Sequence, residues 1–135
     1  MKHVLAVLGL AALAMAVPQT ARAQNAQKVP PFIQETYPEQ AIKAAVTERQ
    51  EVMRSGALDD KTKYLIALGV AAQIPCRYCV YFDTEAAKHA GATDAQIKEA
   101  IAAAALTRKW STVLNGSDYD FEKLKQQVDA QFAGH

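Results

Sequence analysis

Helical spacing of apolar residues restricts the fold of this chain more than any other feature. From Tyr37 onward, apolar side chains recur at steps of three and four, the period that places them on one face of an α-helix. No stretch shows the apolar and polar alternation of a half-buried strand. We therefore predict an all-α fold, a compact helical domain of about five helices.

Signals for helix ends divide this region. Asp59 is suited to cap one helix, and Thr93 with Gln96 forms a capping-box pattern at the start of another. We expect Gly56 to adopt the left-handed conformation that ends many helices, and Gly91 to close the third helix. The predicted helices cover about 38–55, 59–74, 76–89, 93–114 and 117–132. The second of them is apolar nearly all round, so we expect it to be central.

Many of the apolar positions in these helices are alanines. Alanine is the best helix former, but it buries little area, so a lone copy has a weak core. We therefore expect a homo-oligomer, in which neighbouring copies complete the burial.

The N-terminal segment has the pattern of a signal peptide. A short basic start precedes a nearly unbroken apolar run over 4–17, and Ala21-Arg22-Ala23 fits a cleavage site. The run is shorter than the roughly 20 residues that span a bilayer. We predict a signal peptide over 1–23, a flexible leader over 24–36 and a helical domain over 37–135. The expected location is periplasmic or secreted.

Charge excludes two kinds of partner. The chain carries 15 Lys and Arg against 14 Asp and Glu, and loss of Lys2 and Arg22 with the signal peptide moves its formal charge from +1 to −1. A nearly neutral protein lacks the basic surface that nucleic acids require, and it has no basic run for an anionic membrane. We expect no nucleic-acid partner and no membrane contact after cleavage.

Cys76 and Cys79 are the only cysteines, and they flank Arg77-Tyr78 at a predicted helix start. A helix N-terminus lowers the pKa of a thiol, and two thiols at this spacing can open and close a disulfide. A disulfide that closes a four-residue loop stabilises a fold only weakly, by roughly 2 kcal/mol in the chain-entropy model. The pair therefore indicates redox chemistry over a structural role. One such pair is weak evidence for a metal site, so we expect neither metal nor cofactor.

Electrostatics distinguishes the two thiols. Cys76 is nearer the positive end of the helix and adjoins Arg77, which favours its thiolate. Asp83 lies one turn beyond Cys79, and its negative charge disfavours a second one there. From the residues alone, Cys76 is the more acidic thiol.

The chain also resembles a known family. Residues 58–68, LDDKTKYLIAL, and 75–93, PCRYCVYFDTEAAKHAGAT, are similar to the lead helix and signature of the carboxymuconolactone decarboxylase-like superfamily. The cysteine pair resembles its alkyl hydroperoxidase D branch. The resemblance covers about 39–114 and implies an all-helical fold assembled into trimers or larger rings. It also implies peroxide reduction through a sulfenic acid.

The resemblance assigns roles to four residues. It implies that Cys79 attacks the peroxide and that Cys76 resolves the sulfenic acid. The branch has a relay histidine four residues after the second cysteine and a relay glutamate twelve residues before the first. Here these positions hold Asp83 and Tyr64, which we take as candidate relay residues. Neither supplies an imidazole that titrates near neutral pH.

Three functions remain open at this level. The first is an exported thiol peroxidase that reduces a small hydroperoxide with an unidentified thiol reductant. The second is a general thiol–disulfide oxidoreductase acting on disulfide substrates. The third is a non-catalytic helical oligomeric binding protein in which the disulfide only fixes a helix start.

Overall fold

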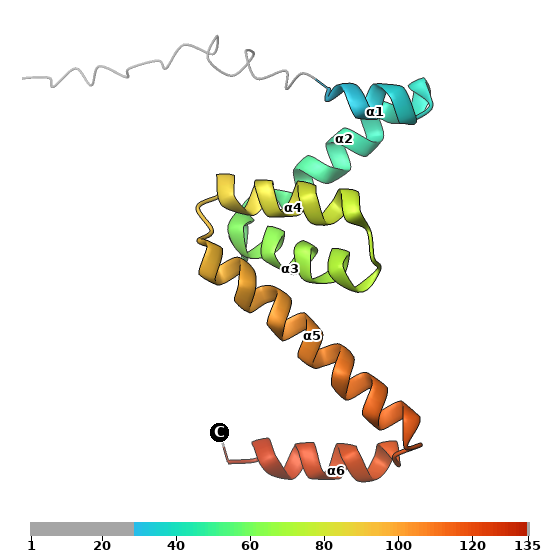
Figure 1. Cartoon of the computed structure of the whole chain (residues 1–135), viewed down its shortest axis with the longest axis vertical. Helices are drawn as coiled ribbons and strands as arrows, with labels where there is room; N and C mark the ends of the chain where they lie inside the picture. The colour runs from blue at the N-terminus through green and yellow to red at the C-terminus, as the bar shows by residue number, and fades with distance from the viewer. Residues whose placement is uncertain (1–28, 135) are drawn as a thin grey trace, which may run out of the picture. The chain divides into compact units, whose positions relative to one another are not determined.

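A computed structural model describes residues 29–134, and this part of the chain contains helices and no strand. The helices are α1 (Pro31–Thr36), α2 (Glu39–Met53), α3 (Asp60–Gln73), α4 (Arg77–His89), α5 (Asp94–Gly116) and α6 (Phe121–Phe132), as labelled in Figure 1. The predicted all-α class is confirmed. The last five helices correspond to the five predicted from apolar spacing.

The chain divides into two units, Met1–Ile42 and Lys43–His135. The described part of the first unit contains α1, which begins with Pro31 at a position that suits proline, and Ile33 is buried there. We did not predict this helix within the leader assigned to 24–36. The predicted signal peptide, 1–23, lies outside the described residues.

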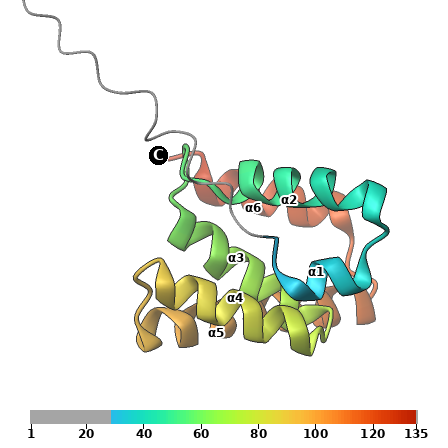
Figure 2. The ribbon, with the colours of Figure 1, turned by 90° about the horizontal axis from the view of Figure 1, so that it is seen from above.

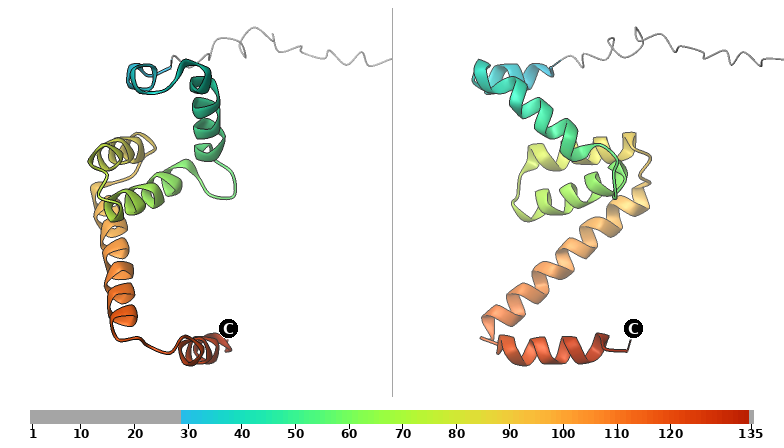
Figure 3. Two further views of the ribbon diagram at one scale, coloured as in Figure 1. Left: turned by 90° about the vertical axis from the view of Figure 1, so that its right-hand side faces the viewer. Right: turned by 180° about the vertical axis from the view of Figure 1, so that it is seen from behind.

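Three helices of the second unit pack together. α3 lies against both α4 and α5, and Figures 2 and 3 show the α3 and α4 ribbons side by side. Their core contains Leu68, Ala87, Ala92 and Ile97. Leu68 is fully buried at 0% exposure, as expected for the predicted central helix. This small core holds α4, the helix that follows the cysteine pair, against α3.

The contact between α3 and α5 depends on small residues. Gly69 is buried, and a Cβ atom added to it would lie 3.4 Å from the Cβ atom of Ala104. The two helix backbones therefore approach more closely than larger side chains would allow. The alanines of α5 thus allow the close packing that positions α3 and, through it, α4.

Most of the predicted helix ends are confirmed. The Asp59 carboxylate accepts a hydrogen bond from the Thr62 N–H at 2.7 Å, and Thr93 and Gln96 form both bonds of a capping box. Gly91 has a φ of +87° and follows the end of α4.

The prediction for Gly56 is wrong. α2 ends at Met53, and among the described glycines only Gly91 has a positive φ. The Lys63 ammonium group donates to the carbonyl oxygens of Val52 and Arg54, at 2.7 and 2.8 Å. A cation from α3 therefore satisfies the carbonyls at the end of α2, and this end needs no left-handed glycine.

Many large apolar side chains remain exposed in a single copy. α6 continues from the far end of α5, and no other described helix packs against it (Figure 3). Phe121 and Phe132, on the predicted apolar face of α6, are 70% and 60% exposed. The predicted homo-oligomer would cover such surface and stays a prediction.

Within residues 29–134, no helix combines the length and apolar character that a bilayer span requires.

Candidate redox site

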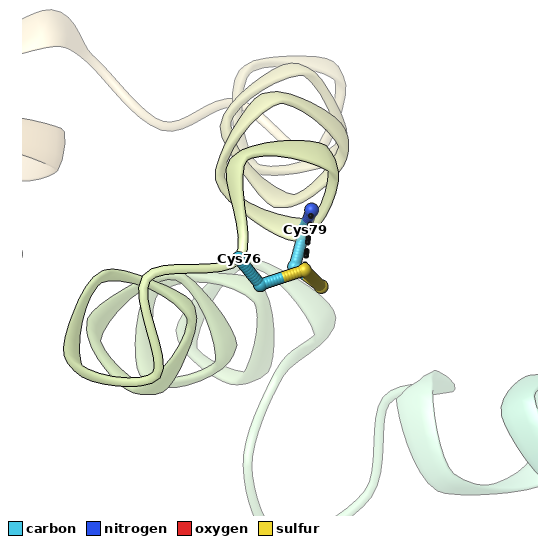
Figure 4. Close-up of a disulfide and its surroundings, with 2 residues drawn as sticks. All are labelled: Cys76 and Cys79. Carbon is cyan, nitrogen blue, oxygen red and sulfur yellow. Dashed lines mark hydrogen bonds between the residues drawn. A yellow bond between two sulfur atoms is a disulfide. The ribbon is translucent and has the colours of Figure 1, made fainter.

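The two cysteines form a disulfide at the junction of α3 and α4. Their sulfur atoms are 1.98 Å apart and their Cα atoms 5.2 Å apart. α3 ends at Gln73, and Ile74 and Pro75 lead to Cys76, which caps α4 (Figure 4). Pro75 interrupts the helical hydrogen bonding here, because it has no backbone N–H to donate. The chain thus places both sulfurs at the start of one helix, as the sequence predicted.

Cys76 is the N-cap residue of α4 through its sulfur atom. Its Sγ accepts a hydrogen bond from the Cys79 backbone N–H, with the two heavy atoms 3.2 Å apart (Figure 4). This N–H would otherwise lack a partner in the first turn. In the reduced protein the same N–H and the positive end of the helix favour a thiolate at Cys76. That Cys76 is the more acidic thiol stays a prediction.

Both cysteines are half-buried, so the disulfide is partly open to solvent. The residues between them, Arg77 and Tyr78, are exposed, and the Arg77 guanidinium carbon lies 5.3 Å from the centre of the Tyr78 ring. A redox disulfide has to be reached by a substrate and a reductant. This degree of exposure meets that requirement.

Asp83 lies one helical turn after Cys79 on the same side of α4 and is only 8% exposed. Burial raises the pKa of its carboxyl group above the ordinary value of 3.8, because the charged form loses solvation. The positive charge of Arg49 acts in the opposite direction on the same pKa. A buried acid next to a dithiol is a candidate proton acceptor, as the sequence suggested.

Tyr64 is half-buried on α3 and packs against the core cluster. Asp83 is buried on α4, the helix that packs against α3. The two candidate relay residues therefore lie on neighbouring helices.

Sequence reasoning missed Arg49, which reaches this region from α2. Its guanidinium carbon lies 4.1 Å from the centre of the Phe82 ring and 6.0 Å from the centre of the Tyr64 ring. The first distance is well within the range of a cation–π contact. No pattern in the sequence indicates this contact, because it depends on the Arg49 side chain reaching rings on two other helices.

Two other features fall outside the redox site. A groove of about 600 Å³ between α3 and α5 is lined mainly by apolar side chains, including Leu65, Val70 and Ala104, and neither cysteine lines it.

Within the described residues, no three His, Cys, Asp or Glu side chains are grouped so that they could hold a metal ion.

Comparisons with known proteins agree with this architecture. Over 57 residues the chain is 46% identical to "Uncharacterized protein 4 in cox locus" of Paracoccus denitrificans; the match covers 42% of this chain and 51% of that protein. The chain thus spans about half the length of this curated relative. A crystal structure of a protein from Methanobacterium thermoautotrophicum matches with a TM-score of 0.56 and 29% identity, over 64% of this chain and 96% of that one.

A family model gives the assignment. The model described as "Carboxymuconolactone decarboxylase family" matches residues 40–119, more than half of the chain. The match includes α3, α4 and α5 and both cysteines. On this evidence, the chain belongs to the carboxymuconolactone decarboxylase family.

Proposed function

We propose that this chain is an exported thiol peroxidase-like protein that reduces an organic hydroperoxide with Cys76 and Cys79. One thiolate attacks the peroxide, which releases the alcohol and leaves a sulfenic acid on the attacking sulfur. The second thiol then displaces water from the sulfenic acid and closes the disulfide. An external dithiol then reduces this disulfide to two thiols and is itself oxidised to a disulfide, which completes the cycle.

The single observation that carries the proposal is the position of a half-buried disulfide at a helix N-terminus. The first turn of α4 donates a hydrogen bond to Cys76 Sγ, so the reduced pair has a stabilised thiolate and a nearby partner. Family membership fits a redox role, and the resemblance to the hydroperoxidase branch supplies the type of substrate.

The neighbours of the pair suggest a slow enzyme. General acid–base assistance contributes about 10²–10⁴-fold to a rate. Asp83 and Tyr64 stand where the resembled branch has histidine and glutamate. Asp83 can accept the thiol proton, but the pKa of a carboxylate matches that of a thiol less well than the pKa of an imidazole does near neutral pH. We therefore expect turnover well below that of a peroxidase with the complete relay.

Hydroperoxide consumption by the reduced full chain tests the proposal. Prereduced protein, freed of reductant, is mixed with cumene hydroperoxide, and peroxide and thiols are counted over time. We expect one peroxide consumed and two thiols lost per chain. A Cys76→Ser, Cys79→Ser double variant should consume peroxide at least tenfold more slowly, because it lacks any thiolate nucleophile. Equal rates in the two proteins would contradict the proposal.

The single variants identify the attacking sulfur. If Cys79 attacks, Cys76→Ser still consumes one peroxide and stops as a sulfenic acid, whereas Cys79→Ser is inactive. If Cys76 attacks, the two variants exchange behaviour. Circular dichroism of each variant shows whether the helices are retained. Rapid exchange with a small disulfide but no peroxide consumption would instead support a general thiol–disulfide oxidoreductase.

Export forms the second part of the proposal. It is supported by the basic start, apolar run and cleavage pattern of residues 1–23. An exported protein needs a reductant outside the cytosol, because oxidising compartments keep exposed dithiols closed. The proposed partner is therefore a thiol reductant of the periplasm or cell exterior, with homo-oligomerisation completing the fold.

A further inference from the structure

A positively charged side chain from α2 lies beside the redox helix. The Arg49 guanidinium packs over the Phe82 ring at 4.1 Å, and Phe82 directly precedes Asp83. The same guanidinium lies 6.0 Å from the centre of the Tyr64 ring on α3. Aromatic rings from two helices thus lie within 6.0 Å of one cation, and one of these rings belongs to the residue that directly precedes Asp83.

The negative charge of Asp83 disfavours ionisation of the Cys79 thiol. It shares a face of α4 with Cys79, so its carboxylate opposes ionisation of that thiol. Burial strengthens the effect, because charges interact more strongly where water is excluded. Unless a cation offsets Asp83, the Cys79 thiolate is disfavoured at neutral pH.

We propose that Arg49 is an electrostatic positioning residue of the redox site, which offsets the Asp83 carboxylate and so allows Cys79 to ionise. The inference deepens the proposed dithiol function and depends on it for its biological meaning. It assigns Arg49 no contact with substrate. The positive charge of Arg49 opposes the field of the Asp83 carboxylate at Cys79, and its contacts with Phe82 and Tyr64 hold this charge in place.

The surroundings of Asp83 support this role. Arg49 of α2 is the charged side chain whose field lowers the Asp83 pKa against the effect of burial. α3 contributes Tyr64 to this region, α4 contributes Cys79 itself, and α5 contributes the apolar Ile97 to the adjoining core. Arg49 is exposed, so salt should screen its influence.

Alkylation of Cys79 as a function of pH measures the proposed effect directly. The experiment uses the full chain with Cys76→Ser, which leaves one thiol and a good N-cap residue. Arg49→Gln should raise the Cys79 pKa and slow alkylation with iodoacetamide about three- to tenfold at pH 7. Asp83→Asn should lower the Cys79 pKa and speed alkylation. Arg49→Lys should stay closer to the parent protein, because it keeps the charge.

Arg54 provides the matched control. It lies just beyond the end of α2, is exposed, and pairs with Glu51 at 2.7 Å. Arg54→Gln should leave the alkylation profile of Cys79 unchanged. The effect of Arg49→Gln should also shrink when the salt concentration rises from about 0.05 to 0.5 M, because the Debye length falls.

Opposite shifts for Arg49→Gln and Asp83→Asn establish the inference, since general loosening of the fold would move both variants in one direction. An unchanged profile in Arg49→Gln, or shifts of the same sign in both variants, would overturn it. The alkylation experiment uses no hydroperoxide, so its outcome does not depend on peroxidase activity. Opposed shifts without peroxide consumption would refute the proposed function alone, whereas peroxide consumption without them would refute the role of Arg49 alone.

Discussion

Replacing Leu68 with alanine is expected to lower the free energy of unfolding by about 2–5 kcal/mol, the usual range for a leucine truncated in a core. Leu68 is the largest fully buried side chain of the described residues. The other buried members of its cluster are Ala87, Ala92 and Ile97, so truncation of Leu68 opens a cavity at the centre of a small core. Chemical denaturation followed by circular dichroism measures the change.

Leu58→Ala is the matched control for this substitution. Leu58 is 47% exposed, so the same chemical change should cost less than about 1 kcal/mol. Both variants and the parent protein are measured at one concentration, because any self-association contributes to apparent stability. A loss below 1 kcal/mol in Leu68→Ala, or equal losses in the two variants, would contradict the assignment of this core.

Reducing the disulfide is expected to cost about 2 kcal/mol of stability and to leave the helices intact. The closed loop contains four residues, and such a loop restricts the unfolded chain only slightly. Neither cysteine belongs to the core cluster, so the packing of α3, α4 and α5 does not depend on the bond. Unfolding in the presence and absence of excess dithiothreitol measures the difference.

A Cys76→Ser, Cys79→Ser variant controls for the reductant itself, because serine at position 76 keeps a capping acceptor for α4. Its stability should not respond to dithiothreitol and should be similar to that of the reduced parent protein. Loss of helical signal on reduction would identify the bond as a structural staple, and the redox function would lose its main support. A redox pair, in contrast, requires a fold that survives in both states.

The sequence is sufficient for much of this architecture because the relevant signals are local. Asp59, Thr93 and Gln96 are recognisable caps, since each bonds the backbone of its own first turn. The placement of Cys76 and Cys79 at a helix start follows in the same way from the preceding proline and the apolar spacing. These features need no information about other helices.

The missed features depend on contacts between distant segments. Gly56 has a reasonable helix-end pattern, but Lys63 from the next helix satisfies the carbonyls at the end of α2. Arg49 lies in a polar stretch of α2, and its contacts with Phe82 and Tyr64 join residues far apart in the sequence. α1 is too short for apolar periodicity to reveal it.

The reduction potential of the Cys76–Cys79 pair tests the central claim most directly. The full chain is equilibrated with thiol–disulfide buffers of graded potential, and alkylated thiols are counted by mass spectrometry, with Cys76→Ser as the control that shows no paired transition. The account predicts a two-electron midpoint above about −300 mV, where cellular thiol systems can open the bond. A midpoint below about −300 mV would mark a permanently closed bond and contradict the account.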